Sequence, residues 1–314
     1  MKRRRFLLGA AGAAAATLSA AAQPALRASS RKGLDFIQVD VFAQTPLSGN
    51  PLVVFPDARG MSDAQMLSIT RELNHSETTF LLPARAGGDA KVRIFGNEGE
   101  IPFSGHPTLG TAFVMALTRP GKTAMILEEG VGPISVTLER RPDGVFIEMT
   151  QTEPVFGPKA DPKMVADAFG FPADEIDGRY PVQSVSTGAV RLIIPLKSAS
   201  TLAKLTLGHQ LPPEQRVLFS NSNYFVVTGE AEIEARFLGF SSEDPATGSA
   251  GGCAAAYLVQ YAIRKPEEHI AIHQGRFVNR PSIVYARTGG AIGKPTNVRV
   301  GGYVVEVARG TFTV

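Results

Sequence analysis

The sequence is poor in cysteine and, after its first 22 residues, in long hydrophobic runs. Cys253 is the only cysteine among 314 residues, so the chain cannot close an internal disulfide. It lies in a run of small residues, where a packed thiol is more common than a reactive one. No stretch after Ala22 is apolar enough to span a bilayer, so we expect no stable membrane anchor in the mature protein.

Acidic residues are absent before Asp35, whereas basic residues cluster at the start of the chain. Lys2-Arg3-Arg4-Arg5 precedes Phe6-Leu7-Leu8 and a Gly/Ala run to Ala22, which resembles a twin-arginine export signal. Ala20-Ala21-Ala22 is a suitable small-residue cleavage site. A transmembrane anchor is the alternative, but the run is short and consists mostly of Ala and Gly. We therefore expect residues 1–30 to be a signal and linker, and the protein to be periplasmic.

A basic tract is also absent once this signal is removed. Without Lys2, Arg3, Arg4 and Arg5, 28 of the 32 Lys and Arg remain against 29 Asp and Glu, a net charge of −1. Nothing is left to neutralise a row of phosphates, so we expect no nucleic-acid partner. With 44% hydrophobic and 19% charged residues, the chain is globular.

Metal and nucleotide motifs are missing as well. His269 and His273 share one face of a strand-like run, but they stand about 13 Å apart at roughly 3.3 Å per residue, too far to share an ion. The stretch from Gly105 to Gly110 lacks the glycine spacing and following lysine of a phosphate loop. We expect neither a metal nor a cofactor.

The patterns of strands and helices predict an α+β fold. From Leu34 the residues Ile37, Val39 and Val41 alternate with Gln38 and Asp40, as in a strand. Ser62 and Gln65 form a capping box that starts a helix ending near Asn74. Further strand-like runs are at 92–95, 123–127, 134–138, 145–149, 190–195, 224–227, 231–237, 270–273, 282–286 and 303–307, and a helix starts at Asp161-Pro162. They do not alternate regularly with helices.

Two similar stretches of the chain each lead into a run of small residues. His106-Pro107-Thr108-Leu109-Gly110-Thr111-Ala112 and Asp244-Pro245-Ala246-Thr247-Gly248-Ser249-Ala250 both read X-Pro-x-x-Gly-(Thr/Ser)-Ala. Because proline suits the first helical position, we predict two buried helices capped by His106 and Asp244. Each half, 34–150 and 151–314, would wrap a mostly antiparallel sheet around one helix, and the last strand could pair with either half.

Facing one cleft, the amide ends of two such helices would hold an anionic substrate. Asp244 as a cap would be a weak base, and the same positive end would discourage protonation of His106. Glu77 lies at a helix-to-strand junction and is our candidate base. The alternatives without a function are that both prolines only start helices and that Glu77 is a solvated side chain. A loose internal alignment sets Ser222 opposite Glu77, which would leave a single base in the cleft.

Several motifs together resemble the PhzF-like phenazine-biosynthesis isomerase family. They are Gly49-Asn50-Pro51, Ser76-Glu77-Thr78-Thr79-Phe80, Ile101-Pro102-Phe103-Ser104-Gly105-His106-Pro107-Thr108, Glu243-Asp244-Pro245-Ala246-Thr247-Gly248-Ser249-Ala250, Gln274-Gly275 and Arg280-Pro281-Ser282. The resemblance implies a diaminopimelate-epimerase-like fold of two pseudo-symmetric domains, cofactor-free proton transfer and a homodimer.

The resemblance also implies the roles of individual residues. Glu77 moves the proton, while the groups at Gly105, His106, Asp244, Gly248 and Ser249 bind and orient the substrate, and we add Asn50 as a substrate-binding residue. The related epimerases have cysteines at both helix starts, whereas this chain has Gly105 there, which argues against a two-thiol mechanism. An export signal is unusual for a biosynthetic isomerase and weakens phenazine as the product.

We therefore predict a cofactor-independent isomerase that acts on a small carboxylate-bearing substrate. Glu77 would shuttle the proton, and His106 and Asp244 would hold polar groups of the substrate. Two alternatives stay open. One is a two-base racemase or epimerase, which inversion of stereochemistry or a pKa near neutrality at Asp244 would favour. The other is a non-catalytic periplasmic protein that binds small anions.

Overall fold

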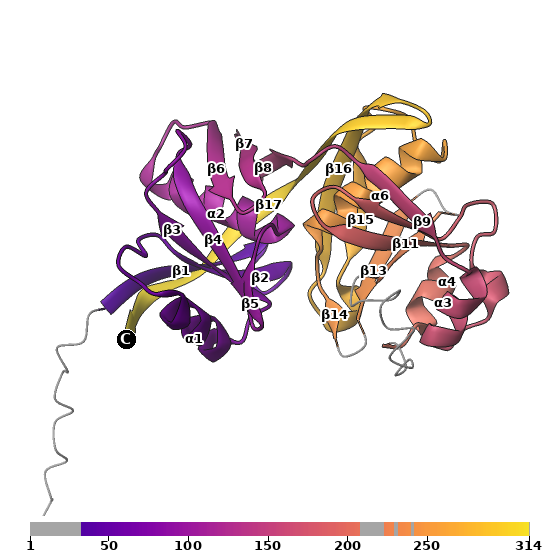
Figure 1. Ribbon diagram of the computed structural model, residues 1–314, viewed down its shortest axis with the longest axis horizontal. Helices are drawn as coiled ribbons and strands as arrows, with labels where there is room; N and C mark the ends of the chain where they lie inside the picture. The colour runs from indigo at the N-terminus through magenta and orange to yellow at the C-terminus, as the bar shows by residue number, and fades with distance from the viewer. Residues whose placement is uncertain (1–32, 208–222, 229–231, 240–241, 314) are drawn as a thin grey trace, which may run out of the picture. The chain divides into compact units, whose positions relative to one another are not determined.

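The structure is a computed structural model that describes residues 33–207, 223–228, 232–239 and 242–313 (Figure 1). All of these described residues belong to one compact unit. The predicted signal, its cleavage site and Ser222 lie outside the described residues. Among the described helices, none has the length and apolar character needed to cross a membrane.

In the first half of the described chain, strands surround one central helix, α2 (Gly105–Thr118). The strands are β1 (Gly33–Val41), β2 (Asn50–Phe55), β3 (Glu77–Leu82), β4 (Ala90–Gly96), β5 (Gly99–Ile101), β6 (Ala124–Glu129), β7 (Gly132–Arg141) and β8 (Gly144–Thr150). Helix α1 (Asp63–Leu73) lies outside this arrangement, against β3 and β4. Its capping box of Ser62 and Gln65 and its left-handed C-cap Asn74 are as predicted.

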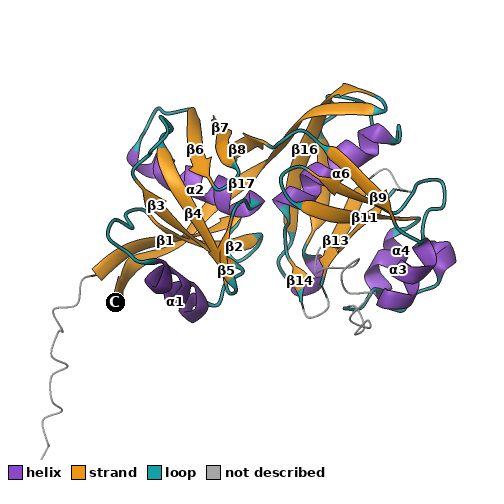
Figure 2. Ribbon diagram, viewed as in Figure 1, coloured by secondary structure: helices purple, strands orange, loops and turns teal. Residues whose placement is uncertain are grey.

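The second half repeats the arrangement around helix α6 (Gly248–Gln260) (Figure 2). Its strands are β9 (Val155–Lys159), β10 (Gln183–Ser186), β11 (Val190–Leu196), β12 (Asn223–Val227), β13 (Ile233–Leu238), β14 (Glu243–Asp244), β15 (Ile270–Gln274) and β16 (Ser282–Ala291). The described part of this half also contains helices α3 (Pro162–Phe169) and α4 (Ala199–Lys204) and the short 3₁₀ helices η1 (Ala173–Glu175) and η2 (Arg276–Val278). Asp161 caps α3, as predicted.

The last strand, β17 (Lys294–Thr313), connects the two halves. It pairs first with β16, then with β8, and finally with β1, always antiparallel. The sequence analysis left open which half the last strand would pair with, and in the structure it pairs with strands of both halves. Most ladders are antiparallel, and the parallel ones are β2–β3, β4–β6, β11–β12 and β13–β15. The α+β prediction is confirmed, while the boundary at residue 150 stays a prediction.

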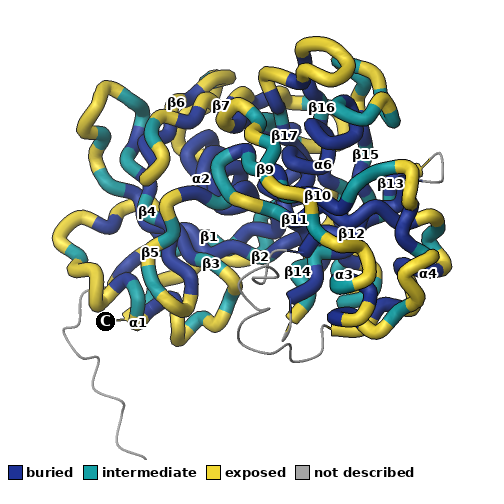
Figure 3. The backbone as a smooth tube through the Cα atoms, turned by 45° about the vertical axis from the view of Figure 1, so that its right-hand side comes forward, coloured by how far each residue is buried: buried dark blue, intermediate teal, exposed yellow. Residues whose placement is uncertain are grey.

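Both central helices are buried because they lack a polar face. Every residue from Gly105 to Ala116 in α2 and from Gly248 to Val259 in α6 is buried, as the dark tube in Figure 3 shows. A helix that is apolar all round is stable only when other elements cover it on every side. The small residues of α6 allow the sheet to approach closely, and the buried thiol of Cys253 is packed there, as predicted.

Candidate active site

The two central helices begin where the sequence did not predict. Helix α2 starts at Gly105 with Ser104 as N-cap, and α6 starts at Gly248 with Thr247 as N-cap. The prediction that His106 and Asp244 are caps is therefore wrong. Pro107 is the third residue of α2, where its missing N–H has no intrahelical acceptor to lose, so proline did not identify the first helical position.

The N-terminal ends of α2 and α6 nevertheless open into one cavity, as predicted. It has a volume of about 400 Å³ and is lined from α2 by Gly105 and His106 and from α6 by Gly248 and Ser249. Its other lining residues are Asn74, His75, Ser76, Glu77, Asn97, Ser104, Arg191, Phe237, Ser242, Glu243, Asp244, Pro245 and Thr247. Of the predicted site residues, only Asn50 is not part of the lining.

Glu77 points into this cavity from the first residue of β3. Its side chain is 17% exposed, so the alternative of a solvated glutamate does not hold. The Ser104 hydroxyl donates to Oε1 at 3.3 Å, whereas Oε2 is buried and has no hydrogen-bond partner. The backbone of Glu77 is fixed by pairing with Gly96 of β4. A carboxylate with one unpartnered oxygen on a fixed strand is a suitable proton acceptor.

His106 is a polar neighbour of that oxygen. Its Nε2 lies 3.6 Å from Oε2 of Glu77, and the residue is 3% exposed. Burial lowers the pKa of His106, while the charge of Glu77 opposes this shift and His75 adds to it. The imidazole is therefore neutral at neutral pH, as predicted, but through desolvation rather than through the helix end.

Asp244 differs from its predicted character as well as from its predicted position. It lies in β14, four residues before α6 begins. Burial first, and then the negative charge of Glu77, raise the pKa of Asp244 to about 7. The prediction of a weak base is wrong, because no helix end compensates for the loss of water around the carboxylate.

Several neighbours hold the Asp244 carboxylate in place. The amide of Asn50 donates to its Oδ1 at 2.8 Å and to the carbonyl oxygen of Ala246 at 2.8 Å, and the Thr247 hydroxyl donates to its Oδ2. Gln274 donates to the Asp244 carbonyl oxygen at 2.8 Å. Asn50 therefore positions Asp244 rather than lining the cavity, which corrects its predicted placement.

The loop that leads to Asn50 is itself fixed by the buried side chain of Asp40 and by Arg280. Asp40 of β1 is 1% exposed and accepts a hydrogen bond from Arg280 at 2.6 Å. The same guanidinium donates to the carbonyl oxygens of Ser48 and Gly49, at 2.7 Å each. Arg280 thus ties the segment before β16 to the loop before β2, which brings Asn50 to Asp244.

Arg191 is a lining residue that the sequence analysis missed. It lies in β11, and its Nε and Nη2 donate to the hydroxyl of Ser249 at 3.2 and 2.8 Å. Its guanidinium lies over the ring of Phe237, 5.3 Å from the centroid. The only signal in the sequence was a charged residue within the otherwise apolar run 190–195, which by itself indicates no partner.

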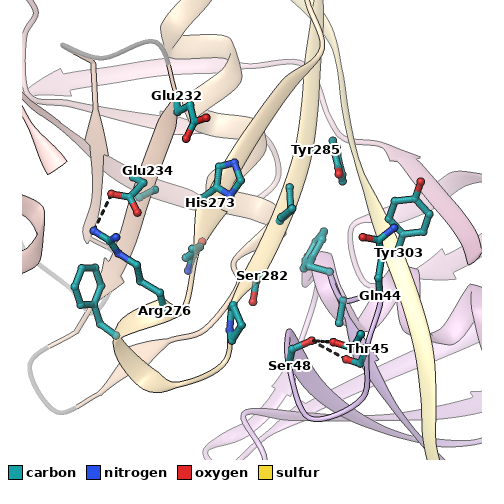
Figure 4. A pocket seen from close by; sticks show the side chains of 17 residues that line it. Gln44, Thr45, Ser48, Glu232, Glu234, His273, Arg276, Ser282, Tyr285 and Tyr303 are labelled. Atoms are coloured by element: carbon teal, nitrogen blue, oxygen red, sulfur yellow. Dashed lines mark hydrogen bonds and ion pairs between the residues drawn. The ribbon is translucent and has the colours of Figure 1, made fainter. Parts of the chain in front are cut away.

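The described residues contain no group of three His, Cys, Asp or Glu placed to hold a metal ion. His273 lines a different cavity, also of about 400 Å³, beside β15 and β16 (Figure 4). Within it, Arg276 pairs with Glu234, and Ser48 with Thr45. Unlike the cavity at the helix ends, it is not lined by the first residues of α2 or α6.

Comparisons with known proteins show the family of the chain. The family model described as phenazine biosynthesis-like protein (PhzC-PhzF) matches residues 39–310. A trans-2,3-dihydro-3-hydroxyanthranilate isomerase of Pseudomonas chlororaphis is 34% identical over 89% of this chain and 99% of its own length.

Two solved structures share the architecture over nearly the whole chain. A predicted epimerase from Pseudomonas aeruginosa is 35% identical with a TM-score of 0.77, covering 90% of this chain and 99% of that one. A PhzF-family phenazine biosynthesis protein from Bacillus anthracis is 22% identical with a TM-score of 0.79, covering 90% of this chain and 100% of that one. The latter likeness concerns the fold alone.

Proposed function

The chain belongs to the phenazine biosynthesis-like (PhzC-PhzF) family and is a PhzF-like isomerase, and we propose that it transfers a proton on a small carboxylate-bearing substrate without a cofactor. The observation that carries this proposal is the unpartnered, buried Oε2 of Glu77, which faces a cavity between two helix ends. An oxygen that lacks a protein partner is available to a substrate proton.

In the proposed reaction, Glu77 takes a proton from one carbon of the substrate. The C–H electron pair is delocalised into the substrate's conjugated system, and Glu77 returns the proton at another atom. No net charge or atom is gained, so the reaction is an isomerisation. Nε2 of the neutral His106 lies 3.6 Å from Oε2 of Glu77, and His106 can donate a hydrogen bond to a substrate oxygen. The free amide groups of the first helical turns would stabilise negative charge on the substrate.

The proposed substrate class follows from the site and from the relatives. Helix N-termini favour anions, and a cavity of about 400 Å³ suits a molecule of single-ring size. The relative from Pseudomonas chlororaphis is named as an isomerase of trans-2,3-dihydro-3-hydroxyanthranilate, which carries a carboxylate. We take this compound as the first trial substrate and expect no nucleic-acid partner.

The decisive experiment replaces Glu77 by Gln and follows turnover of trial carboxylates in D₂O. Acid–base assistance contributes about 10² to 10⁴-fold in rate, so Glu77→Gln should lose most activity and most deuterium incorporation. Glu72→Gln, at an exposed position of α1, is the matched control and should keep both. Unchanged turnover by Glu77→Gln would exclude the proposed base. Ligand binding by the wild-type protein without any deuterium uptake would identify a non-catalytic binding protein instead.

A two-base epimerase is the second candidate, and the pKa of about 7 at Asp244 favours it. A carboxyl group that titrates near neutrality can serve as an acid or a base. Product stereochemistry separates the candidates: a single base delivers the proton to the face from which it came, whereas two bases invert the centre. Inversion at the carbon that loses its proton would select the two-base reaction.

We further propose export to the periplasm and a homodimer. The Lys2-Arg3-Arg4-Arg5 sequence supports export, and the family resemblance supports the dimer. Cell fractionation of the full chain should find the protein in the periplasm, and a variant with Arg3→Lys and Arg4→Lys should be retained in the cytoplasm. Light scattering of the purified protein should give twice the mass of one chain. Equal distribution of both forms between compartments, or a monomer mass, would contradict these proposals.

A further inference from the structure

Both candidate proton-transfer groups in the cavity at the helix ends are acids, and their negative charge would repel an anionic substrate. Glu77 and Asp244 line the cavity, and burial first, then the negative charge of Glu77, raise the pKa of Asp244. The two histidines there, His75 and His106, have lowered pKa values, mainly because of burial. A substrate carboxylate would therefore enter a cavity without positive charge if no other group supplied it.

Arg191 supplies that charge at the α6 end of the cavity. Arginine stays protonated under physiological conditions, and its planar fork matches the geometry of a carboxylate. The guanidinium is held in place: Nε and Nη2 both donate to Oγ of Ser249, and the group rests on the Phe237 ring. Two N–H groups of the fork thus share a single oxygen, whereas a carboxylate would offer each of them an oxygen of its own.

The adjacent first turn of α6 adds further donors. Thr247 makes no side-chain cap hydrogen bond, and the first N–H groups of a helix have no intrahelical acceptor. An independent observation indicates a ligand in the same cavity: Nε2 of His106, in a residue that is 3% exposed, is buried without a hydrogen-bond partner. Buried polar atoms of this kind normally have a partner, and a bound substrate would provide one.

We propose that Arg191, together with the Gly248–Ser249 turn, forms the subsite that binds the substrate's carboxylate. This proposal rests on the proposed function and adds to it the residue that selects an acid over a neutral analogue. With the carboxylate held at the Ser249 end, the reacting carbon lies toward Glu77 and His106. Arg191 is thus a specificity-determining residue, and it takes no part in the proton transfer.

A pair of probes that differ only in charge tests this subsite. Binding of 2-aminobenzoate and of its neutral amide, 2-aminobenzamide, is measured by calorimetry for the wild type, Arg191→Met and Arg191→Lys. Hydrogen bonds to charged groups contribute about 1.5–3 kcal/mol, so Arg191→Met should weaken acid binding by about 10- to 100-fold. Binding of the amide should change little. The affinity of Arg191→Lys for the acid should lie between those of the wild type and Arg191→Met, because lysine keeps the charge but lacks the planar fork.

Two further variants give the controls. Arg287→Met removes another half-buried arginine, which pairs with Glu148 away from the cavity, and should leave both affinities unchanged. Glu77→Gln should keep acid binding while it loses turnover, so failure of the subsite and failure of the proposed isomerase reaction can be told apart. Should Arg191→Met unfold, Arg191→Lys provides the same comparison.

The proposal is overturned by either of two results. In the first, wild-type protein binds acid and amide equally or binds neither. In the second, both Arg191 variants keep the wild-type preference for the acid. Addition of guanidinium chloride at millimolar concentration to Arg191→Met should partly restore acid binding and leave amide binding unaffected. A purely structural role of Arg191 would not produce this selective rescue.

Discussion

The backbone of Gly105 lies directly against that of Gly248, so the first residues of the two central helices touch. A Cβ atom on Gly105 would stand 2.8 Å from the amide nitrogen of Ser249 and 2.9 Å from the Cα of Gly248. Both contacts are with backbone, which cannot move aside as a flexible side chain can. This close approach is what brings two helix ends, distant in sequence, into one cavity.

Gly105→Ala should therefore separate the helix ends. Overpacking typically costs about 1–3 kcal/mol, so we expect that loss in the free energy of unfolding, measured with urea, and a marked loss of activity. Gly178→Ala is the matched control, because a Cβ there meets no atom within 4 Å. Wild-type stability and turnover of Gly105→Ala would show that the contact can relax and does not define the site.

Asn50→Ala should weaken the site without changing its lining. The substitution removes one hydrogen-bond donor from the Asp244 carboxylate and one from the Ala246 carbonyl oxygen. Leaving a buried acceptor unsatisfied costs about 1–3 kcal/mol, which should appear in urea unfolding. Since hydrogen bonding by Asn50 lowers the pKa of Asp244, that pKa should rise in the variant. Carboxyl ¹³C chemical shifts of Asp244 that titrate as in wild type would contradict the positioning role.

The raised pKa of Asp244 makes stability depend on pH in a defined direction. The ordinary value is 3.8 and the folded value about 7, so the native state binds more protons than the unfolded state between these limits. Stability should fall as pH rises from about 4 to about 7, and Asp244→Asn should reduce this slope. Urea unfolding at pH 4, 5.5 and 7 measures it. A stability that rises over the same interval in wild type but not in Asp244→Asn would refute the prediction.

Glu129, which contacts Thr108 of α2, should add to this pH dependence of stability. Its Oε1 accepts a hydrogen bond from the Thr108 hydroxyl at 2.7 Å, and the oxygen of that hydroxyl also lies 2.8 Å from the Ser104 carbonyl oxygen. The single Thr108 proton is shared between these two acceptors, and Oε2 of Glu129 is buried without a hydrogen-bond partner, so the surroundings stabilise the ionised form of Glu129 poorly. Consistently, burial raises the pKa of Glu129 from 4.5 to about 8, although the hydrogen bond from Thr108 opposes the shift.

Glu129→Gln preserves a neutral donor at this position and should flatten the loss of stability between pH 4.5 and 8. The sign is the same as for Asp244, because the folded state again retains its proton longer than the unfolded state. Thermal unfolding of both proteins across this pH range measures the effect. Identical pH profiles for Glu129→Gln and wild type would mean that Glu129 is ionised in the folded protein.

Local patterns in the sequence were sufficient where neighbouring residues decide the structure. The capping box at Ser62, the strand alternation after Leu34 and the small-residue runs that follow Pro107 and Pro245 led to elements that the structure contains. Short strands such as β5, β9 and β14 were missed, because runs of two to five residues are too short to show a clear alternating pattern. The functional motifs at Glu77, His106 and Asp244 were found, and they do line one cavity.

By itself, the sequence determined the fold class, the family and the set of groups available for proton transfer. The tertiary structure alone decided where each helix begins, that Asn50 lies behind Asp244, that Arg191 faces the cavity, and that Asp244 titrates near pH 7. The physical reason is that helix starts, pKa values and the direction of a buried guanidinium depend on desolvation and on contacts between segments far apart in the chain. The spacing of residues along the chain does not reveal those distances.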